Sequence, residues 1–124
     1  MSRFIFIRNL NQPNLSPARV KYCDSFLCRL RGLMFRQSLD SDDGLLLVQG
    51  RRDSRLDTSI HMLFVPFNLA VFWISTDMIV VDKIIAKGWR PAYAPAKPAC
   101  YILEIHPQRW DDYQIGDKVD FQDA

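Results

Sequence analysis

The alternation of apolar and polar positions along the chain predicts a protein built mainly from short β-strands. The most apolar stretch, residues 59–74, is rich in β-branched and aromatic side chains and is interrupted by Pro66. Because proline cannot donate a hydrogen bond to a sheet ladder, we expect two strands there, near Ile60–Phe64 and at Leu69–Ile74. Similar short runs predict further strands at residues 4–8, 19–23, 44–48, 78–86 and 101–105, with a last one ending at residue 121.

One segment has helical spacing instead. Its apolar residues recur three and four positions apart, at Phe26, Leu27, Leu30, Leu33 and Met34. This pattern predicts one short amphipathic α-helix near residues 24–35. Asp24 stands where an N-terminal cap is expected, and Gly32 is a candidate for the C-terminal cap.

The number and spacing of these elements predict the fold class. About eight short strands with one helix are typical of a small β-sandwich or barrel of jelly-roll type, whereas a parallel α/β sheet needs several crossover helices. A length of 124 residues suits a single domain, residues 1–124. Apolar residues make up 48% of the chain and charged residues 24%, which is the composition of a folded globular protein and not of a disordered one.

Charge and hydropathy exclude some classes of partner. The net charge is only +2, and aspartates stand between the basic residues of the most basic region, so we expect no nucleic-acid partner. The N-terminal apolar run, Phe4–Ile7, is too short for a secretion signal, and no window is long enough to span a bilayer. We therefore expect a cytoplasmic protein that has no membrane partner.

The three cysteines add a further expectation. The number is odd, and no Cys-x-x-Cys pair is present, so neither a closed disulfide framework nor a zinc site is predicted. We expect Cys23, Cys28 and Cys100 to be reduced thiols, buried as small apolar side chains. The five glycines are scattered singly, so no phosphate-binding loop and no cofactor are predicted.

Several blocks, taken in order, resemble the family known as domain of unknown function 192. The first is Arg-Leu-Arg-Gly-Leu-Met-Phe-Arg at residues 29–36, followed by an acidic turn and Gly-Leu-Leu-Leu at 44–47. The central block is residues 59–73, and later blocks begin at Trp89, Tyr101 and Gly116. The resemblance covers residues 20–121 and implies a compact β-sandwich or barrel with one helix. It implies no activity, because the biochemical role of that family is not established.

This sequence departs from the family pattern at two turns. After the strand at residues 101–105 the family often has a small-residue and glycine turn, where this chain has His106, Pro107 and Gln108. After the strand that matches residues 70–73 the usual acidic residue is replaced by Ile74 and Ser75.

His61 is the sharpest candidate for a functional side chain. An imidazole titrates near neutral pH and can act as a base, a ligand or a hydrogen-bond donor. A metal site needs three or four ligands, and no other histidine or cysteine lies at ligand spacing, so no metal ligand is assigned. The competing interpretation is a buried histidine bonded to a backbone carbonyl. A nucleophilic pair of His61 with Cys28 or Cys100 would also need a third, orienting group, and we disfavour it.

Glu104 is the second candidate, because it is a carboxylate inside an apolar strand. It either faces solvent on the alternate side or is buried and paired, with Arg31 or Arg90 as the candidate partners. A glycosidase would need a second facing carboxylate, for which Asp82 is a possibility that no spacing requires.

Basic and aromatic residues supply the remaining candidates. Arg31 offers a guanidinium fork to a carboxylate, phosphate or sugar hydroxyl pair, and the structural alternative is a cap on the predicted helix. Trp89 and Arg90 lie with Tyr93 in a proline-rich loop, where aromatic residues either stack on a ligand or close the core. Trp73, inside a strand, is expected to be core.

These candidates favour a binding or interaction module over an enzyme. The hypothesis is a shallow site at one rim, formed by His61, Arg31, Trp89, Arg90 and Glu104, for a small molecule or a protein partner. One alternative is a small hydrolase or lyase with His61 and Glu104 as acid and base groups; another is a purely structural or oligomerising domain. A pocket holding His61 within hydrogen-bond reach of Glu104 or Cys100 would favour the enzyme.

Overall fold

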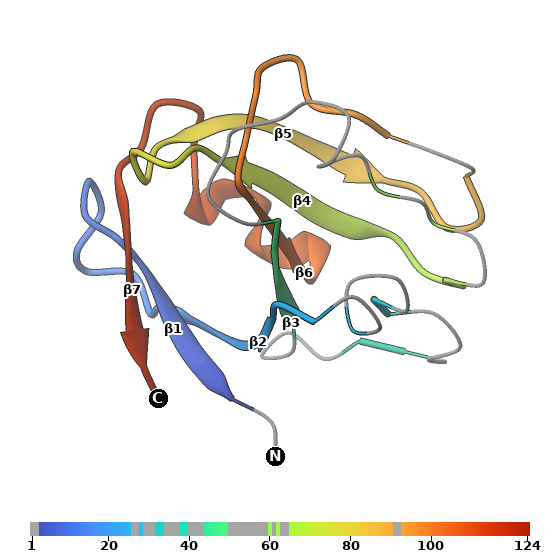
Figure 1. Cartoon of the computed structure of the whole chain (residues 1–124), viewed down its shortest axis with the longest axis horizontal. Helices are drawn as coiled ribbons and strands as arrows, with labels where there is room; N and C mark the ends of the chain where they lie inside the picture. The colour runs from blue at the N-terminus through green and yellow to red at the C-terminus, as the bar shows by residue number, and fades with distance from the viewer. Residues whose placement is uncertain are drawn as a thin grey trace.

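The computed structural model describes residues 3–25, 28, 32–33, 38–39, 44–49, 60, 62, 65–90 and 93–124. Within these residues the chain is mainly β, as predicted (Figure 1). The elements, in chain order, are β1 (Phe4–Asn9), β2 (Ala18–Cys23), β3 (Gly44–Val48), β4 (Leu69–Ile74), β5 (Val80–Ala86), β6 (Tyr101–Ile105), the 3₁₀-helix η1 (Pro107–Asp112) and β7 (Val119–Asp123).

These strands form one strongly curved sheet in the order β5-β4-β6-β3-β2-β1-β7. Neighbouring strands are antiparallel except β2 and β3, which are parallel. The edge strands β5 and β7 approach each other at one end, where Ile79 bridges Lys118 and the Val119 N–H donates to the Met78 carbonyl at 2.9 Å. The sheet therefore curls toward a barrel and is not closed along its edges.

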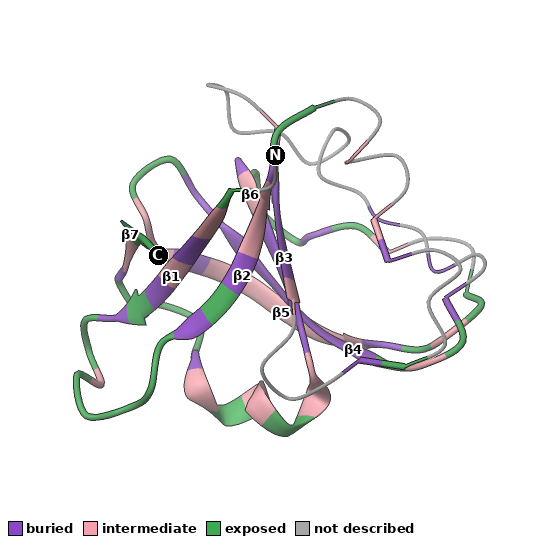
Figure 2. Cartoon of the chain, turned by 90° about the horizontal axis from the view of Figure 1, so that it is seen from below, coloured by how far each residue is buried: buried purple, intermediate pink, exposed green. Residues whose placement is uncertain are grey.

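The curvature separates two apolar clusters, one on each face of the sheet. The inner cluster takes residues from every strand and is filled by Phe72, Leu103 and Tyr113. The outer cluster includes Trp73 and Ile102 from the sheet, and Leu33 and Met62 from connecting segments. Because successive residues of a strand point to opposite faces, a strand buried at every position must be covered on both sides. β4 is such a strand, and Figure 2 shows its buried positions in purple.

Most of the predicted helix near residues 24–35 lies outside the described residues. Two described contacts belong to this segment. The Ser25 hydroxyl accepts a hydrogen bond from the Cys28 N–H at 3.2 Å, as a capping residue does, and the Gly32 N–H donates to the Cys28 carbonyl at 2.9 Å. Gly32 has φ +51°, the left-handed conformation that commonly ends a helix, in agreement with its predicted role.

The predicted strand at Ile60–Phe64 also lies mostly outside the described residues. Ile60, which is described, forms an isolated bridge with Tyr93. The 3₁₀-helix η1 was not predicted, because six residues are too few to show helical spacing. It begins after His106, whose Nδ1 accepts the Gln108 N–H at 3.0 Å.

The prediction of three reduced cysteines is wrong. Cys23 and Cys28 form a disulfide with their Cα atoms 5.6 Å apart, while Cys100 is buried and takes no part in it. Five residues of spacing permit this bond because the chain turns back directly after β2, so that the two Cα atoms come within disulfide range. In the described part of the chain, no helix has the length and apolar character needed to cross a membrane.

Candidate functional site

Glu104 is a buried carboxyl group at the centre of the sheet. It lies on β6 between Leu45 of β3 and Val71 of β4, on the outer face, and is only 4% exposed. The interpretation that its side chain faces solvent is therefore wrong; of the alternative, that it is buried and paired, the burial is confirmed. The strand pattern could not decide this, because it does not show that connecting segments cover the outer face.

Burial changes the acidity of this group. Loss of hydration raises the pKa of Glu104 from 4.5 to about 7, because burial penalises the charged form. Among the described residues, none donates a hydrogen bond or offers a cation to its carboxyl oxygens. Arg90, one of its two predicted partners, is exposed and does not pair with it; Arg31, the other, lies outside the described residues.

Gly32 lies directly beside the carboxyl group. A Cβ atom added at Gly32 would lie 4.0 Å from Glu104 Oε1. Gly32 is joined by a hydrogen bond to Cys28, which the disulfide fixes to the end of β2. The covalent link at Cys28 therefore helps to position the backbone that approaches Glu104.

Trp89 and Arg90 lie on a turn that is fixed to the same face. The Trp89 N–H donates to the Met62 carbonyl at 2.9 Å, and the Met62 N–H donates to the Arg90 carbonyl at 2.9 Å. Met62 is fully buried in the outer cluster. The same cluster contains Leu45 and Val71, the residues paired with Glu104 on the two neighbouring strands. Gly88 permits the close approach, because a Cβ atom there would lie 2.8 Å from the Val65 carbonyl oxygen.

The side chain of Trp89 is 56% exposed, and its backbone has φ +67°, a conformation that is uncommon outside glycine. Arg90 is also exposed. The turn thus presents an aromatic ring and a guanidinium group to solvent, and the alternative of a tryptophan closing the core does not hold for Trp89. Tyr93 does have that structural role: it is half-buried, pairs with Ile60, and its hydroxyl accepts the Lys87 N–H at 2.9 Å.

His61 lies outside the described residues, as Arg31 does. Their chain neighbours Met62 and Gly32 both lie on the outer face, Met62 in its cluster and Gly32 beside Glu104. The described residues thus bring Glu104, Trp89 and Arg90 to one side of the sheet. The His61 imidazole is not among the described groups, so no contact between it and Glu104 is assigned.

Other candidates have structural roles. Asp82 accepts the Ala96 N–H at 2.7 Å and so fixes the loop that precedes β6. His106 caps η1. Trp73 is 1% exposed and belongs to the core, as predicted. Within the described residues, no three His, Cys, Asp or Glu side chains are grouped so that they could hold a metal ion.

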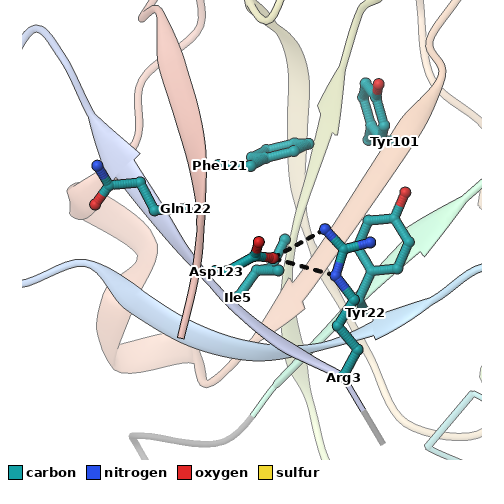
Figure 3. Close-up of a pocket in the computed structure, with 7 residues that line it drawn as sticks. All are labelled: Arg3, Ile5, Tyr22, Tyr101, Phe121, Gln122 and Asp123. Atoms are coloured by element: carbon teal, nitrogen blue, oxygen red, sulfur yellow. Dashed lines mark hydrogen bonds and ion pairs between the residues drawn. The ribbon is translucent and has the colours of Figure 1, made fainter.

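The structure also contains a hollow that sequence reasoning missed. It encloses about 180 Å³ at the open end of the curved sheet, and Figure 3 shows its lining. The lining residues come from the first 22 and the last 24 residues of the chain: Arg3, Ile5, Tyr22, Tyr101, Phe121 and Asp123, with Gln122 beside them. No local motif could reveal this set, because the pairing of β1 with β7 and β2 and the contact of Tyr101 on β6 with Phe121 on β7 bring it together.

Comparisons with known proteins agree with the fold. A model of the domain of unknown function 192 family, described as uncharacterised ACR, matches residues 8–121. A UPF0127 protein of Thermococcus kodakarensis is 38% identical over 86 residues, which cover 69% of this chain and 52% of that protein. A UPF0127 protein of Thermococcus sibiricus is 36% identical over 107 residues, covering 84% of this chain and 66% of that protein. The chain thus spans between half and two thirds of the length of these two relatives.

Two crystal structures share the fold at low sequence identity. A Sinorhizobium meliloti protein described as a candidate transcription regulator has a TM-score of 0.80 at 16% identity, over 98% of this chain and 94% of that one. A protein of unknown function from Novosphingobium aromaticivorans has a TM-score of 0.75 at 17% identity, over 94% of this chain and 83% of that one. At such identity the likeness concerns the fold alone.

Proposed function

We propose that this chain, which belongs to the domain of unknown function 192 family, is a small-ligand-binding module with its site on the outer face of the sheet, around Glu104. The observation that carries the proposal is a carboxyl group that is 4% exposed and that no described residue pairs with. Leaving a buried polar group without a partner costs about 1–3 kcal/mol, and no described residue supplies a partner to Glu104. A bound ligand that offers N–H or O–H donors would supply it.

The surface residues of the same face support this proposal. Trp89 and Arg90 offer a stacking surface and N–H donors on a turn that backbone hydrogen bonds hold in place. His61 and Arg31 stay in the proposed set as sequence predictions, and both lie outside the described residues. The occupant of such a site is a polar small molecule or the polar end of a protein partner.

The test is a thermal-shift screen at pH 7 against divalent metals, mono- and oligosaccharides, nucleotides and small carboxylates. A ligand that binds only the folded chain raises the unfolding midpoint by mass action. We expect a compound whose effect disappears in Glu104→Gln and falls in Trp89→Ala. The matched controls are Asp120→Asn, which changes a half-buried carboxyl group paired with Arg8, and Ile115→Ala, which truncates an apolar side chain 57% exposed. A midpoint that no compound raises, or a shift that survives Glu104→Gln, would contradict the proposal.

One observation favours a second candidate, acid–base catalysis in a small hydrolase or lyase. A carboxyl group with a pKa of about 7 can both accept and release a proton at neutral pH, which is what a general acid or base requires. If a compound found by the screen is chemically converted during incubation, and Glu104→Gln binds it without converting it, the enzyme becomes the better description.

The cytoplasmic location and the absence of a nucleic-acid partner stay predictions from the sequence. The Cys23–Cys28 disulfide weighs against the predicted cytoplasmic location, because such bonds persist mainly in oxidising compartments. The expectation of no nucleic-acid partner continues to depend on the small net charge.

A further inference from the structure

The hollow at the open end of the sheet lies on the inner face, opposite the face that carries Glu104. Its floor is Ile5, a buried residue of the inner cluster, and its walls are aromatic (Figure 3). The rings of Tyr101 on β6 and Phe121 on β7 meet edge to face with their centroids 5.0 Å apart, across the interior of the curved sheet. Tyr22 at the end of β2 completes the apolar part of the lining.

The volume of the hollow limits what it can hold. Pockets for drug-sized molecules have volumes of about 300–1,000 Å³, whereas an apolar cavity of about 150 Å³ holds one benzene ring. A hollow of about 180 Å³ therefore suits a single six-membered ring.

An ion pair forms the polar rim of the hollow. Arg3 donates from Nε and Nη2 to Asp123 Oδ1 at 3.2 and 2.9 Å, and its guanidinium group lies 4.4 Å from the centre of the Tyr22 ring. A guanidinium group has five N–H donors; two bond to Asp123 here, and the other three bond to no described residue. Among the described residues none donates to Asp123 Oδ2. The rim thus offers hydrogen-bond donors and an acceptor side by side, beside aromatic rings.

The ion pair of Arg3 and Asp123 favours a neutral ring over a charged one. An anionic ring would meet the Asp123 carboxylate next to Arg3, and a cationic ring would meet the guanidinium group next to Asp123. A hydroxyl group both donates and accepts, so two neighbouring hydroxyls on a neutral ring match the pair. The C–H face of a pyranose would then pack on the aromatic wall, as apolar ring faces do.

We propose that the hollow lined by Arg3, Tyr22, Tyr101, Phe121 and Asp123 is a binding site for a neutral pyranose ring. The site is separate from the proposed site around Glu104, because the two lie on opposite faces of the sheet. A substitution at one is therefore expected to leave the other unchanged.

The test is a two-dimensional ¹H–¹⁵N NMR titration of the whole chain with three probes: the methyl glycosides of glucose, galactose and mannose. We expect at least one glycoside to shift the backbone signals of Tyr22, Tyr101 and residues 121–123. Cyclohexanol, a ring of the same size with one hydroxyl group, and benzoate, an anionic ring, are the control probes, and we expect weaker binding from both.

Two carboxyl groups on the same strand supply a matched pair of variants. Asp123→Asn removes the charge at the rim, from a side chain 78% exposed near the chain end, so folding is expected to persist. Asp120→Asn changes a second ion pair, in which Arg8 of β1 contacts Asp120 of β7 outside the hollow. We expect Asp123→Asn to weaken glycoside binding about tenfold, by loss of one charge-assisted hydrogen bond, and Asp120→Asn to change it less than about twofold.

Three results would overturn the proposal. In the first, none of the glycosides shifts the signals of the lining residues. In the second, Asp120→Asn weakens binding as much as Asp123→Asn does. In the third, cyclohexanol or benzoate binds as tightly as the best glycoside, which would mean that the hollow recognises a ring without its hydroxyl pair.

Discussion

At the scale of single residues, two buried side chains, Tyr113 and Glu104, differ in the hydrogen-bond partners that the described residues give them. Tyr113 is 2% exposed, and its hydroxyl donates to the Ile7 carbonyl at 2.6 Å and accepts the Ala18 N–H at 3.4 Å. Its burial raises the pKa of the phenol to about 12, so the group stays protonated and its donation is kept at physiological pH. Glu104 has no such partner among the described residues.

Tyr113→Phe is expected to lower the free energy of unfolding by about 1–3 kcal/mol, because it leaves the buried Ile7 carbonyl without its donor. Urea denaturation measures the change. Tyr22→Phe is the control, since Tyr22 is half-buried and its hydroxyl is bonded to no described residue. An equal loss in both variants would mean that the Tyr113 hydroxyl has no special role.

Glu104 predicts a pH dependence of stability. Between pH 4.5 and about 7 the folded chain keeps a proton that the unfolded chain releases, so raising the pH favours unfolding. The contribution is complete below pH 4.5 and is lost as the pH rises through about 7, with a total of about 3 kcal/mol. The measurement is the free energy of unfolding of the natural chain against Glu104→Gln over this range. A difference between the two that does not change with pH would contradict the prediction.

At the scale of elements, local patterns predicted several strands correctly. The strands expected at residues 44–48, 69–74 and 101–105 have the observed bounds, because dense apolar and β-branched runs determine them locally. The order of strands and the parallel pairing of β2 with β3 were not predicted, because they depend on contacts far apart in the chain. The lining of the hollow was missed for the same reason.

Lys83 shows how an element can be held by one side chain. From β5 its ammonium group donates to the carbonyls of Trp110 and Tyr113 at 3.1 and 3.2 Å and to Gln114 Oε1 at 3.0 Å, at the end of η1. It also lies 3.9 Å from the centre of the Trp110 ring. Partial burial lowers the pKa of Lys83, because the charged form loses hydration.

Lys83→Met is expected to lower the free energy of unfolding by about 1–3 kcal/mol, since hydrogen bonds from a charged donor are lost while most of the side-chain volume is kept. Urea denaturation again gives the value. Lys97→Met, at an exposed position, is the matched control and is expected to change stability by less than about 0.5 kcal/mol. If Lys83→Met leaves the free energy of unfolding unchanged, η1 is fixed by packing alone.

At the scale of the whole molecule, the sequence predictions for Glu104, Trp89 and Arg90 depend on which parts of the chain cover the outer face of the sheet. The sequence placed Glu104 in an apolar strand but could not show that the outer face is covered, so both orientations stayed open. It placed Trp89 and Arg90 in a loop but could not show that Met62 fixes this loop to the same face. The disulfide escaped prediction because cysteine spacing alone does not show where the chain turns.

Reduction of the Cys23–Cys28 bond is expected to lower the free energy of unfolding by about 2 kcal/mol, from the added freedom of a short loop in the unfolded chain. The comparison is urea denaturation with and without a dithiol reductant. Cys100→Ala should lose the same amount on reduction, whereas Cys28→Ser should no longer respond to the reductant. A response that persists in Cys28→Ser would contradict the assignment.

The proposed site depends on Glu104 being a buried carboxyl group whose pKa lies near neutral pH. The measurement is the side-chain carboxyl ¹³C signal of Glu104, followed by NMR as the pH is raised, with Glu104→Gln to assign the signal. We predict a midpoint near pH 7. A midpoint near 4.5 would mean that the carboxyl group is hydrated or paired in solution. That result would contradict the buried, unpaired carboxyl group from which the site is proposed.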